Sequence, residues 1–245
     1  MISIIEAQKR YYANHGWSQV YCLFPANSTH DLGNKNQDLG KNFGNILLIN
    51  DYTILPGFGY DMHPHQNLEQ VFFIIEGELT HQDSLKNTLV LKKGSVQRIT
   101  AGSGYARSNH NKTKLPARYI GVWLLPKAQN QHPEHDVKEY DPQLWNGAFY
   151  PIVSDQPVRQ SIPGYPAISF NAAATLYRVT VGPSELAFSV PEGHKALLYV
   201  IEGNIVCNGS QMETGAHARI SGEEQLQLRS DTKGECLFVL MRTEI

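Results

Sequence analysis

The sequence is poor in cysteine and has no long apolar run. Its three cysteines, Cys22, Cys207 and Cys236, are an odd number without the paired spacing of a zinc site or a disulfide framework. We therefore expect reduced thiols in a cytoplasmic protein. No apolar stretch approaches the roughly 18 residues that span a membrane, and no basic segment with an apolar run opens the chain as a secretory signal would. A membrane partner is accordingly not expected.

An excess of either charge is missing as well. Lys and Arg number 21 and Asp and Glu number 23, which gives a formal net charge of -2. Binding to phosphate backbones requires clustered basic residues, and blocks of like charge are absent from this sequence. The composition thus predicts no nucleic-acid partner.

Helical periodicity is the third absence. No window sustains an apolar repeat of 3.6 residues; instead, short runs of β-branched and aromatic residues, such as residues 71–75 and 197–201, alternate with glycine turns. Many short strands separated by such turns are typical of sandwiches and barrels. The sequence therefore predicts an all-β protein.

An internal repeat is present. Residues 73–79 resemble residues 199–205, each copy contains a Glu-Gly turn, and each is followed by a further turn glycine, Gly94 or Gly215. A repeat of this kind indicates a duplicated architecture.

The region between the two copies predicts the domain boundaries. Residues 126–165 contain six prolines among polar residues, which is typical of a connecting segment. We expect an N-terminal domain at residues 1–125, a linker at 126–165 and a C-terminal domain at 166–245.

The most informative motif is a His-x-His pair with a carboxylate four residues further on. If this segment is extended, side chains alternate between faces, so His63, His65 and Glu69 point the same way. Two imidazoles and a carboxylate form the ligand set of non-haem Fe(II) oxygenases. These three residues are therefore predicted metal ligands. The matching positions in the second copy are Ser189 and Pro191, so the C-terminal domain is expected to lack ligands.

With these features together, the chain resembles the pirin family, a group of bicupins. The first cupin motif of that family reads here from Gly57 through His63, His65 and Glu69 to Gly77. Further pirin-like segments, in the order of the family, are residues 14–17, 49–51, 81–84 and 100–104. The resemblance implies two packed cupin domains of β-barrel or β-sandwich type. It also implies the quercetin 2,3-dioxygenase activity known for some pirins.

The chain departs from the family in the second motif. Where metal-binding pirins place a His and a Glu to complete the site, this sequence has Arg107 and Asn109. A guanidinium has no lone pair for a metal, and we expect it to oppose a cation or to form a bidentate pair with Glu69. His110 would supply an imidazole only if the strand slipped by one residue. Tyr105 is expected at the cavity mouth or in the core.

Three functions remain open at this point. The first is a pirin-like bicupin with a weakened or lost metal site that binds a small aromatic ligand or acts in regulation. The second is a dioxygenase that holds Fe(II) or another divalent transition metal through His63, His65 and Glu69. The third is a pirin-like protein that acts through a protein partner.

Overall fold

The computed structural model describes most of the chain. The described residues are 1–23, 43–157, 162, 164–222 and 224–243.

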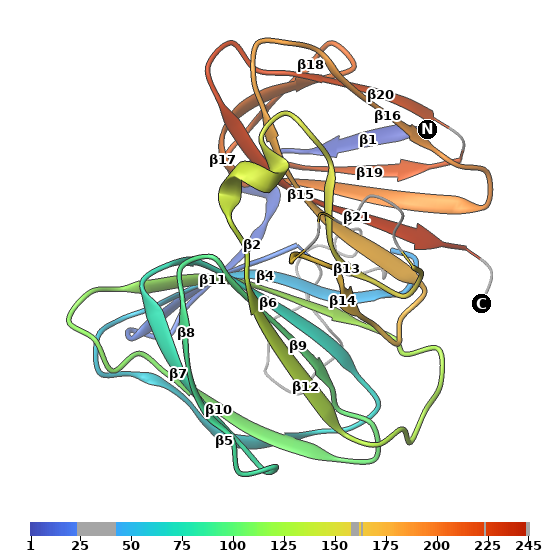
Figure 1. Ribbon diagram of the computed structural model, residues 1–245. Coiled ribbons are helices and arrows are strands. Elements are labelled where there is room, and N and C mark those ends of the chain that lie inside the picture. Colours follow the sequence, from blue (N-terminus) through green and yellow to red (C-terminus); the bar gives the residue numbers. More distant parts are fainter. Residues whose placement is uncertain (24–42, 158–161, 163, 223, 244–245) are drawn as a thin grey trace. The chain divides into compact units, whose positions relative to one another are not determined.

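The chain forms two compact units, which Figure 1 shows in colours that follow the sequence. One unit consists of residues 11–140, and the other combines residues 1–10 with residues 141–245. Helical structure in the described part is limited to the short 3-10 turns η1 (Ala7–Lys9) and η2 (Pro142–Trp145), and no helix there is long and apolar enough to cross a membrane. The predicted all-β bicupin is confirmed.

The unit of residues 11–140, called the N-terminal cupin below, contains two antiparallel sheets. The larger has seven strands in the order β12-β9-β6-β11-β4-β3-β2, and the smaller has four in the order β5-β10-β7-β8. The strands are β2 (Tyr11–Asn14), β3 (Ser18–Cys22), β4 (Ile46–Ile54), β5 (Gly59–His65), β6 (Glu69–Glu76), β7 (Glu78–Asp83), β8 (Thr88–Lys92), β9 (Ser95–Thr100), β10 (Tyr105–His110), β11 (Ala117–Leu124) and β12 (Glu134–Glu139).

The core of the N-terminal cupin lies between these sheets. Phe72 and Ile74 from β6 belong to one buried apolar cluster with Leu79 of β7 and Leu91 of β8. Because side chains alternate along a strand, the even-numbered residues of β6 face the smaller sheet, and the odd-numbered residues face away from it. This alternation decides which side chains can reach the predicted site.

The second unit, called the C-terminal cupin below, is also built from strands. The path of its main sheet is β1-β19-β17-β21-β15-β13-β14, while β18 and β20 pair with β17, and β16 pairs with β20. The strands are β1 (Ile2–Ile5), β13 (Tyr150–Ser154), β14 (Ile168–Ser169), β15 (Ala174–Val181), β16 (Leu186–Val190), β17 (His194–Cys207), β18 (Ser210–Glu213), β19 (His217–Ser221), β20 (Glu224–Arg229) and β21 (Gly234–Arg242).

The repeated Glu-Gly pairs differ in setting: Gly77 lies between β6 and β7, whereas Gly203 lies within the continuous strand β17. Gly77 and Gly203 both have positive φ, +69° and +82°. A Cβ atom at these positions would lie 2.7 Å from the carbonyl oxygen of Pro116 and 2.2 Å from that of Lys233. Only glycine combines this backbone conformation with such a close approach, which explains why the repeat keeps it.

The units differ from the predicted segmentation in two respects. Residues 1–10 belong to the C-terminal cupin, where β1 pairs antiparallel with β19 and Ile2 lies opposite Ile220. In addition, the predicted linker 126–165 contains β12 and β13, and the division between the units falls after Tyr140. Pro126 follows β11, Pro133 precedes β12 and Pro142 begins η2, which are positions where a missing N–H is tolerated.

Candidate functional site

Strands β5 and β10 place the predicted residues on one face of the smaller sheet. In their antiparallel pairing His63 lies opposite Arg107, and His65 lies opposite Tyr105. Directly opposed residues point to the same face, so these four side chains are neighbours. The strands approach closely at Gly59, where a Cβ atom would lie 2.2 Å from the carbonyl oxygen of Asn109.

The Arg107 guanidinium lies in the interior of the N-terminal cupin. The residue is 4% exposed, and its Nε donates a hydrogen bond to Gln70 Oε1 on β6 at 3.2 Å. The guanidinium carbon lies 4.4 Å from the centre of the Phe72 ring, a cation–π contact. Burial lowers the pKa of Arg107, but an arginine remains protonated in proteins. A permanent positive charge therefore sits between the two sheets.

Asn109 connects Arg107 to a buried polar chain. With its amide oriented to satisfy both neighbours, the oxygen accepts from Arg107 Nη1 at 3.0 Å and the nitrogen donates to His81 Nδ1 at 2.8 Å. His81 Nε2 lies 3.1 Å from the Tyr105 hydroxyl, which in turn donates to Asp83 Oδ2 at 2.7 Å. The residues from β7 and β10 thus form one continuous network.

Asp83 is the anionic end of this chain. Burial alone would raise the pKa of its carboxyl, but hydrogen bonds from Tyr105 and Asn87 outweigh that effect and lower it. The main-chain N–H groups of Leu85 and Asn87 also donate to Asp83 Oδ1, both at 2.9 Å. The carboxylate is therefore held by its own loop and makes no ion pair with Arg107 among the described residues.

Glu69 does not join the two histidines, and the prediction that it shares their face is wrong. Alternation applies only within one continuous strand, whereas residues 66–68 separate β5 from β6, which lie in different sheets. Gln70 faces Arg107, so Glu69 points to the opposite face of the larger sheet. There its carboxylate accepts a hydrogen bond from Thr100 Oγ1 at 3.0 Å. The predicted bidentate pair between Arg107 and Glu69 is likewise not formed.

The two histidines lie side by side and are both half-buried. Their ring centres are 4.7 Å apart, and the His65 ring meets Trp123 edge-on at 5.1 Å. His63 Nδ1 is 2.6 Å from the carbonyl oxygen of Asp61, which fixes the proton on Nδ1 and the lone pair on Nε2. Burial lowers the pKa of His65 to about 3, and the charges of Arg107 and His63 act in the same direction.

His110 does not add an imidazole to this face. The register between β5 and β10 shifts between Arg107 and Asn109, but His110 still lies opposite Gly59. Its Nε2 is 3.2 Å from the carboxylate of Asp61, whose side chain is fully at the surface. The predicted rescue of a third imidazole by His110 is not realised in this geometry.

The opposite wall of the site comes from the larger sheet and is aromatic. The Tyr52 and Tyr119 rings stack with centres 4.6 Å apart, and Trp123 lies opposite Gln70 in the pairing of β11 with β6. Gly121 leaves room for these rings, because a Cβ atom there would lie 3.3 Å from both Phe72 and Tyr52.

Several buried polar atoms on these walls have no hydrogen-bond partner among the described residues. They are His65 Nε2, Gln70 Nε2 and Trp123 Nε1. Buried polar atoms are nearly always paired in folded proteins, so a cluster of exceptions requires an explanation. Two of the three, the amide nitrogen of Gln70 and the indole nitrogen of Trp123, are hydrogen-bond donors.

The donors present do not fit a divalent metal ion of the kind the fold family implies. In the described part of the chain no group of three or more His, Cys, Asp or Glu side chains is arranged to hold a metal. His63 and His65 offer two nitrogen donors, but Arg107 and the Asn109 amide occupy the remaining positions of the motif. An arginine cannot ligate, and its charge repels a cation.

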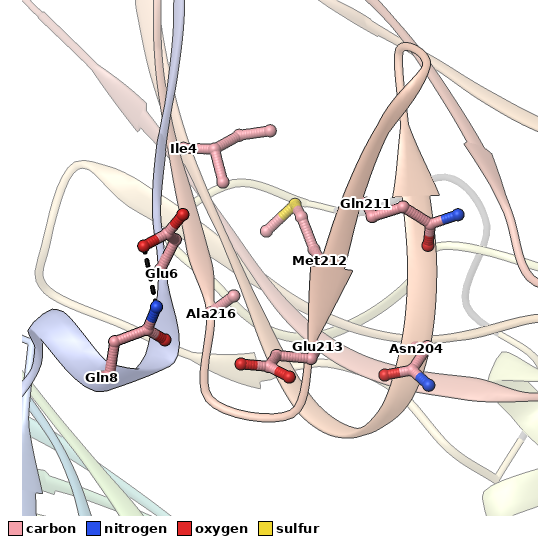
Figure 2. A pocket seen from close by; sticks show the side chains of 8 residues that line it. All are labelled: Ile4, Glu6, Gln8, Asn204, Gln211, Met212, Glu213 and Ala216. Carbon is pink, nitrogen blue, oxygen red and sulfur yellow. Dashed lines mark hydrogen bonds between the residues drawn. The ribbon is translucent and has the colours of Figure 1, made fainter.

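The C-terminal cupin offers a different set of residues. Ser189, one of the positions matching the histidines, lies on β16 and donates to Gln225 Oε1 at 2.5 Å, and the unit's interior is an apolar cluster. A pocket of about 370 Å³ lies beside β1, and Figure 2 shows Glu6, Gln8 and Glu213 among the side chains that line it. Gln8 Nε2 donates to Glu6 at 2.8 Å. These exposed side chains form no catalytic or metal-ligating arrangement.

Sequence reasoning missed the wall contributed by the larger sheet. Gln70, Tyr52, Tyr119 and Trp123 come from three strands that no local pattern brings together. One signal was available, because an uncharged Gln within the apolar run of β6 indicates a polar contact inside the barrel. His81 and Asp83 were visible as part of a pirin-like segment, although their partners were not.

Comparisons with known proteins agree with this architecture. A family model described as Pirin matches residues 8–124, and one described as Quercetinase C-terminal cupin domain matches residues 165–241. Quercetin 2,3-dioxygenase from Escherichia coli K12 is 24% identical over 240 residues, 97% of each chain. A pirin-like protein from Caulobacter vibrioides is 30% identical over 142 residues, 58% of this chain and 59% of that protein.

A solved structure supports the same assignment at the level of fold. The crystal structure of the bacterial pirin YhhW from Escherichia coli in complex with nickel(II) matches with a TM-score of 0.86 at 22% identity, covering 99% of both chains. The two family models together account for the paired cupins described above, and the chain belongs to the pirin family.

Proposed function

We propose that this protein is a pirin-like small-molecule-binding or regulatory protein whose N-terminal cupin works without a bound divalent metal. The observation that carries the proposal is the position of Arg107. Its buried guanidinium stands at a ligand position of the cupin motif and contacts Gln70, Asn109 and the Phe72 ring.

Electrostatics support this reading. A divalent cation a few ångströms from a buried guanidinium would experience a repulsion on the order of several kcal/mol, even at an effective dielectric constant of about 20. The two imidazoles would have to offset this cost without a carboxylate from the described part of the chain, because Glu69 faces away. Metal affinity is therefore expected to be weak.

A second candidate function is that of a quercetin 2,3-dioxygenase, the name of a relative of this chain. In its favour, His63 carries its lone pair on Nε2, the form in which a histidine binds a metal. Against it stands the loss of the third ligand. Glu69 on β6, the third ligand predicted from the sequence, points away from the two histidines.

Metal analysis of protein purified without a His tag tests the proposal. After incubation with Fe(II), Ni(II) or Mn(II) and removal of free ion, we expect far less than one metal per chain, and no oxygen uptake with quercetin. Near-stoichiometric metal that is lost in His63→Ala, together with quercetin-dependent oxygen uptake, would overturn the proposal in favour of the dioxygenase.

A gain-of-binding variant makes this test sharper. Replacing Arg107→His and Asn109→Glu together restores the residue types found in metal-binding pirins, and we expect this variant to retain one divalent ion per chain. The matched control is Arg98→His, a change at another buried arginine of the same unit. If the double variant and the wild type bind metal equally, Arg107 is not what prevents binding.

A further inference from the structure

The charge of Arg107 is not balanced by any acidic residue described in the structure. Its hydrogen-bond partners are two neutral amides, Gln70 and Asn109, and its third contact is the Phe72 ring. The carboxylate of Asp83 is held by Tyr105 and by its own loop. A buried ion without a counter-ion is costly, and such groups are normally paired.

The orphaned donors lie around the same guanidinium. Gln70 accepts from Arg107 through its oxygen, which leaves its amide nitrogen unpaired, and Trp123 lies opposite Gln70 on the neighbouring strand. The cation thus touches one unpaired donor, the Gln70 amide, and a second unpaired donor, the Trp123 indole, belongs to the cross-strand neighbour of Gln70. A negatively charged acceptor would suit all three groups.

The surroundings indicate the shape of that acceptor. The wall formed by Tyr52, Tyr119 and Trp123 is aromatic, and flat rings stack well on such surfaces. His63, His65 and Trp123 are half-buried, so this side of the cluster is accessible from solvent. The buried end holds the Arg107 guanidinium and the Tyr119 ring, and the accessible end holds Trp123 with the two imidazoles.

We propose that the N-terminal cupin binds a small aromatic carboxylate, with the carboxylate on Arg107 and the orphaned donors, and the ring against Trp123 and the two imidazoles. This inference rests on the proposed metal-independent function and names its ligand class. A carboxylate on a guanidinium combines charge and directed hydrogen bonds. It also satisfies the amide of Gln70 and the indole of Trp123, which a neutral hydrocarbon would leave unpaired.

Titration calorimetry with benzoate and benzamide tests the proposal, since these probes share a ring and differ in charge. We expect benzoate to bind at millimolar or lower concentration and benzamide to bind about tenfold more weakly or worse, a difference of about 1.4 kcal/mol. Failure of benzoate, 4-hydroxybenzoate and cinnamate to bind in this range would overturn the inference. Equal binding of benzoate and benzamide would do the same.

Variants locate the binding. Arg107→Gln is expected to reduce benzoate affinity at least about tenfold, while Arg107→Lys retains part of it because the charge remains without the planar fork. Arg98→Gln is the matched control: Arg98 lies opposite Val71, so it projects to the far face of the sheet, and benzoate affinity should be unchanged. Undiminished binding by Arg107→Gln would refute the assignment.

Failure of this inference can be told apart from failure of the proposed function. If the protein holds no metal and binds none of the three carboxylates, only the ligand class is wrong. If benzoate binding disappears after EDTA treatment and persists in Arg107→Gln, a metal is the anion's partner, and the metal-independent function fails as well.

Discussion

A single residue, Arg107, gives the proposed site of the N-terminal cupin a positive charge. Two positions of the second motif here supply a cation and an amide, and burial lowers the pKa of His65 beside them. Such a site would repel a metal ion and attract an anion. Because binding sites often carry groups that reduce the stability of the empty protein, this arrangement has a measurable cost.

Replacing this charge should therefore stabilise the ligand-free protein. We expect Arg107→Gln to raise the free energy of unfolding by about 1 kcal/mol or more, because it removes a buried cation that no described acidic residue balances and keeps a polar group near Gln70 and Asn109. Chemical denaturation measures the change. Arg98→Gln, which loses the contact with Glu134, should not be stabilised; a similar gain in both variants would contradict the explanation.

His217 on β19 should make the C-terminal cupin sensitive to acid. Burial, with added effects of Arg219 and Arg10, lowers its pKa to about 3 from an ordinary value of 6.5. Between these two pKa values His217 is protonated in the unfolded chain and neutral in the folded chain. The free energy of unfolding is therefore highest above about pH 6.5 and falls by about 1.4 kcal/mol per pH unit as the pH is lowered toward 3. Denaturation curves between pH 7 and 4 should show a smaller loss in His217→Gln than in the exposed-site control His132→Gln.

The contrast between Glu69 and the two histidines shows how far sequence reasoning reaches at the residue scale. His63 and His65 share a face because a rule of strand geometry applies within β5, and the sequence predicted this correctly. Glu69 is only four residues beyond His65, but a turn intervenes and the next strand belongs to another sheet. The identity of Arg107 was also visible, whereas its partners Gln70 and Phe72 depend on how the sheets pack.

At the scale of elements, the site depends on the close pairing of β5 with β10. Gly59→Ala would place a methyl group 2.2 Å from the Asn109 carbonyl oxygen and force the strands apart. We expect a loss of about 3 kcal/mol or more in the free energy of unfolding, within the range of severe packing changes, together with loss of benzoate binding. Gly182→Ala is the control, since nothing lies within 4 Å of the added Cβ; equal losses would rule out the steric cause.

The sequence predicted that the elements are strands, but it did not predict which strands pair. Alternating runs and glycine turns indicated strands, and the Glu-Gly repeat identified two glycines with positive φ, of which Gly77 lies between strands and Gly203 within β17. Pairing between distant strands has no local signal. For this reason residues 1–10, which include β1, were predicted to belong to the N-terminal domain. The proline-rich segment 126–165 was predicted to be a linker, although it contains β12 and β13.

At the scale of the whole molecule, residues 1–10 are expected to stabilise only the C-terminal cupin. Deleting them removes one of the two strands that pair with β19, while β17 remains, and exposes the edge of β19. Amide hydrogen exchange should become faster in β19 and remain unchanged in β6 and β11 of the N-terminal cupin. Equal acceleration in both units would show that the segment supports the chain generally.

The pairing of β1 with β19 also affects how the protein emerges from a ribosome. The main chain of Met1 hydrogen-bonds to Ser221 across 220 positions, so β1 has no partner until β19 has been synthesised. Residues 11–140, by contrast, are contiguous and can fold while translation continues, since domains generally fold as units during synthesis. During that interval β1 is a short apolar strand without a partner, the type of segment that chaperones bind.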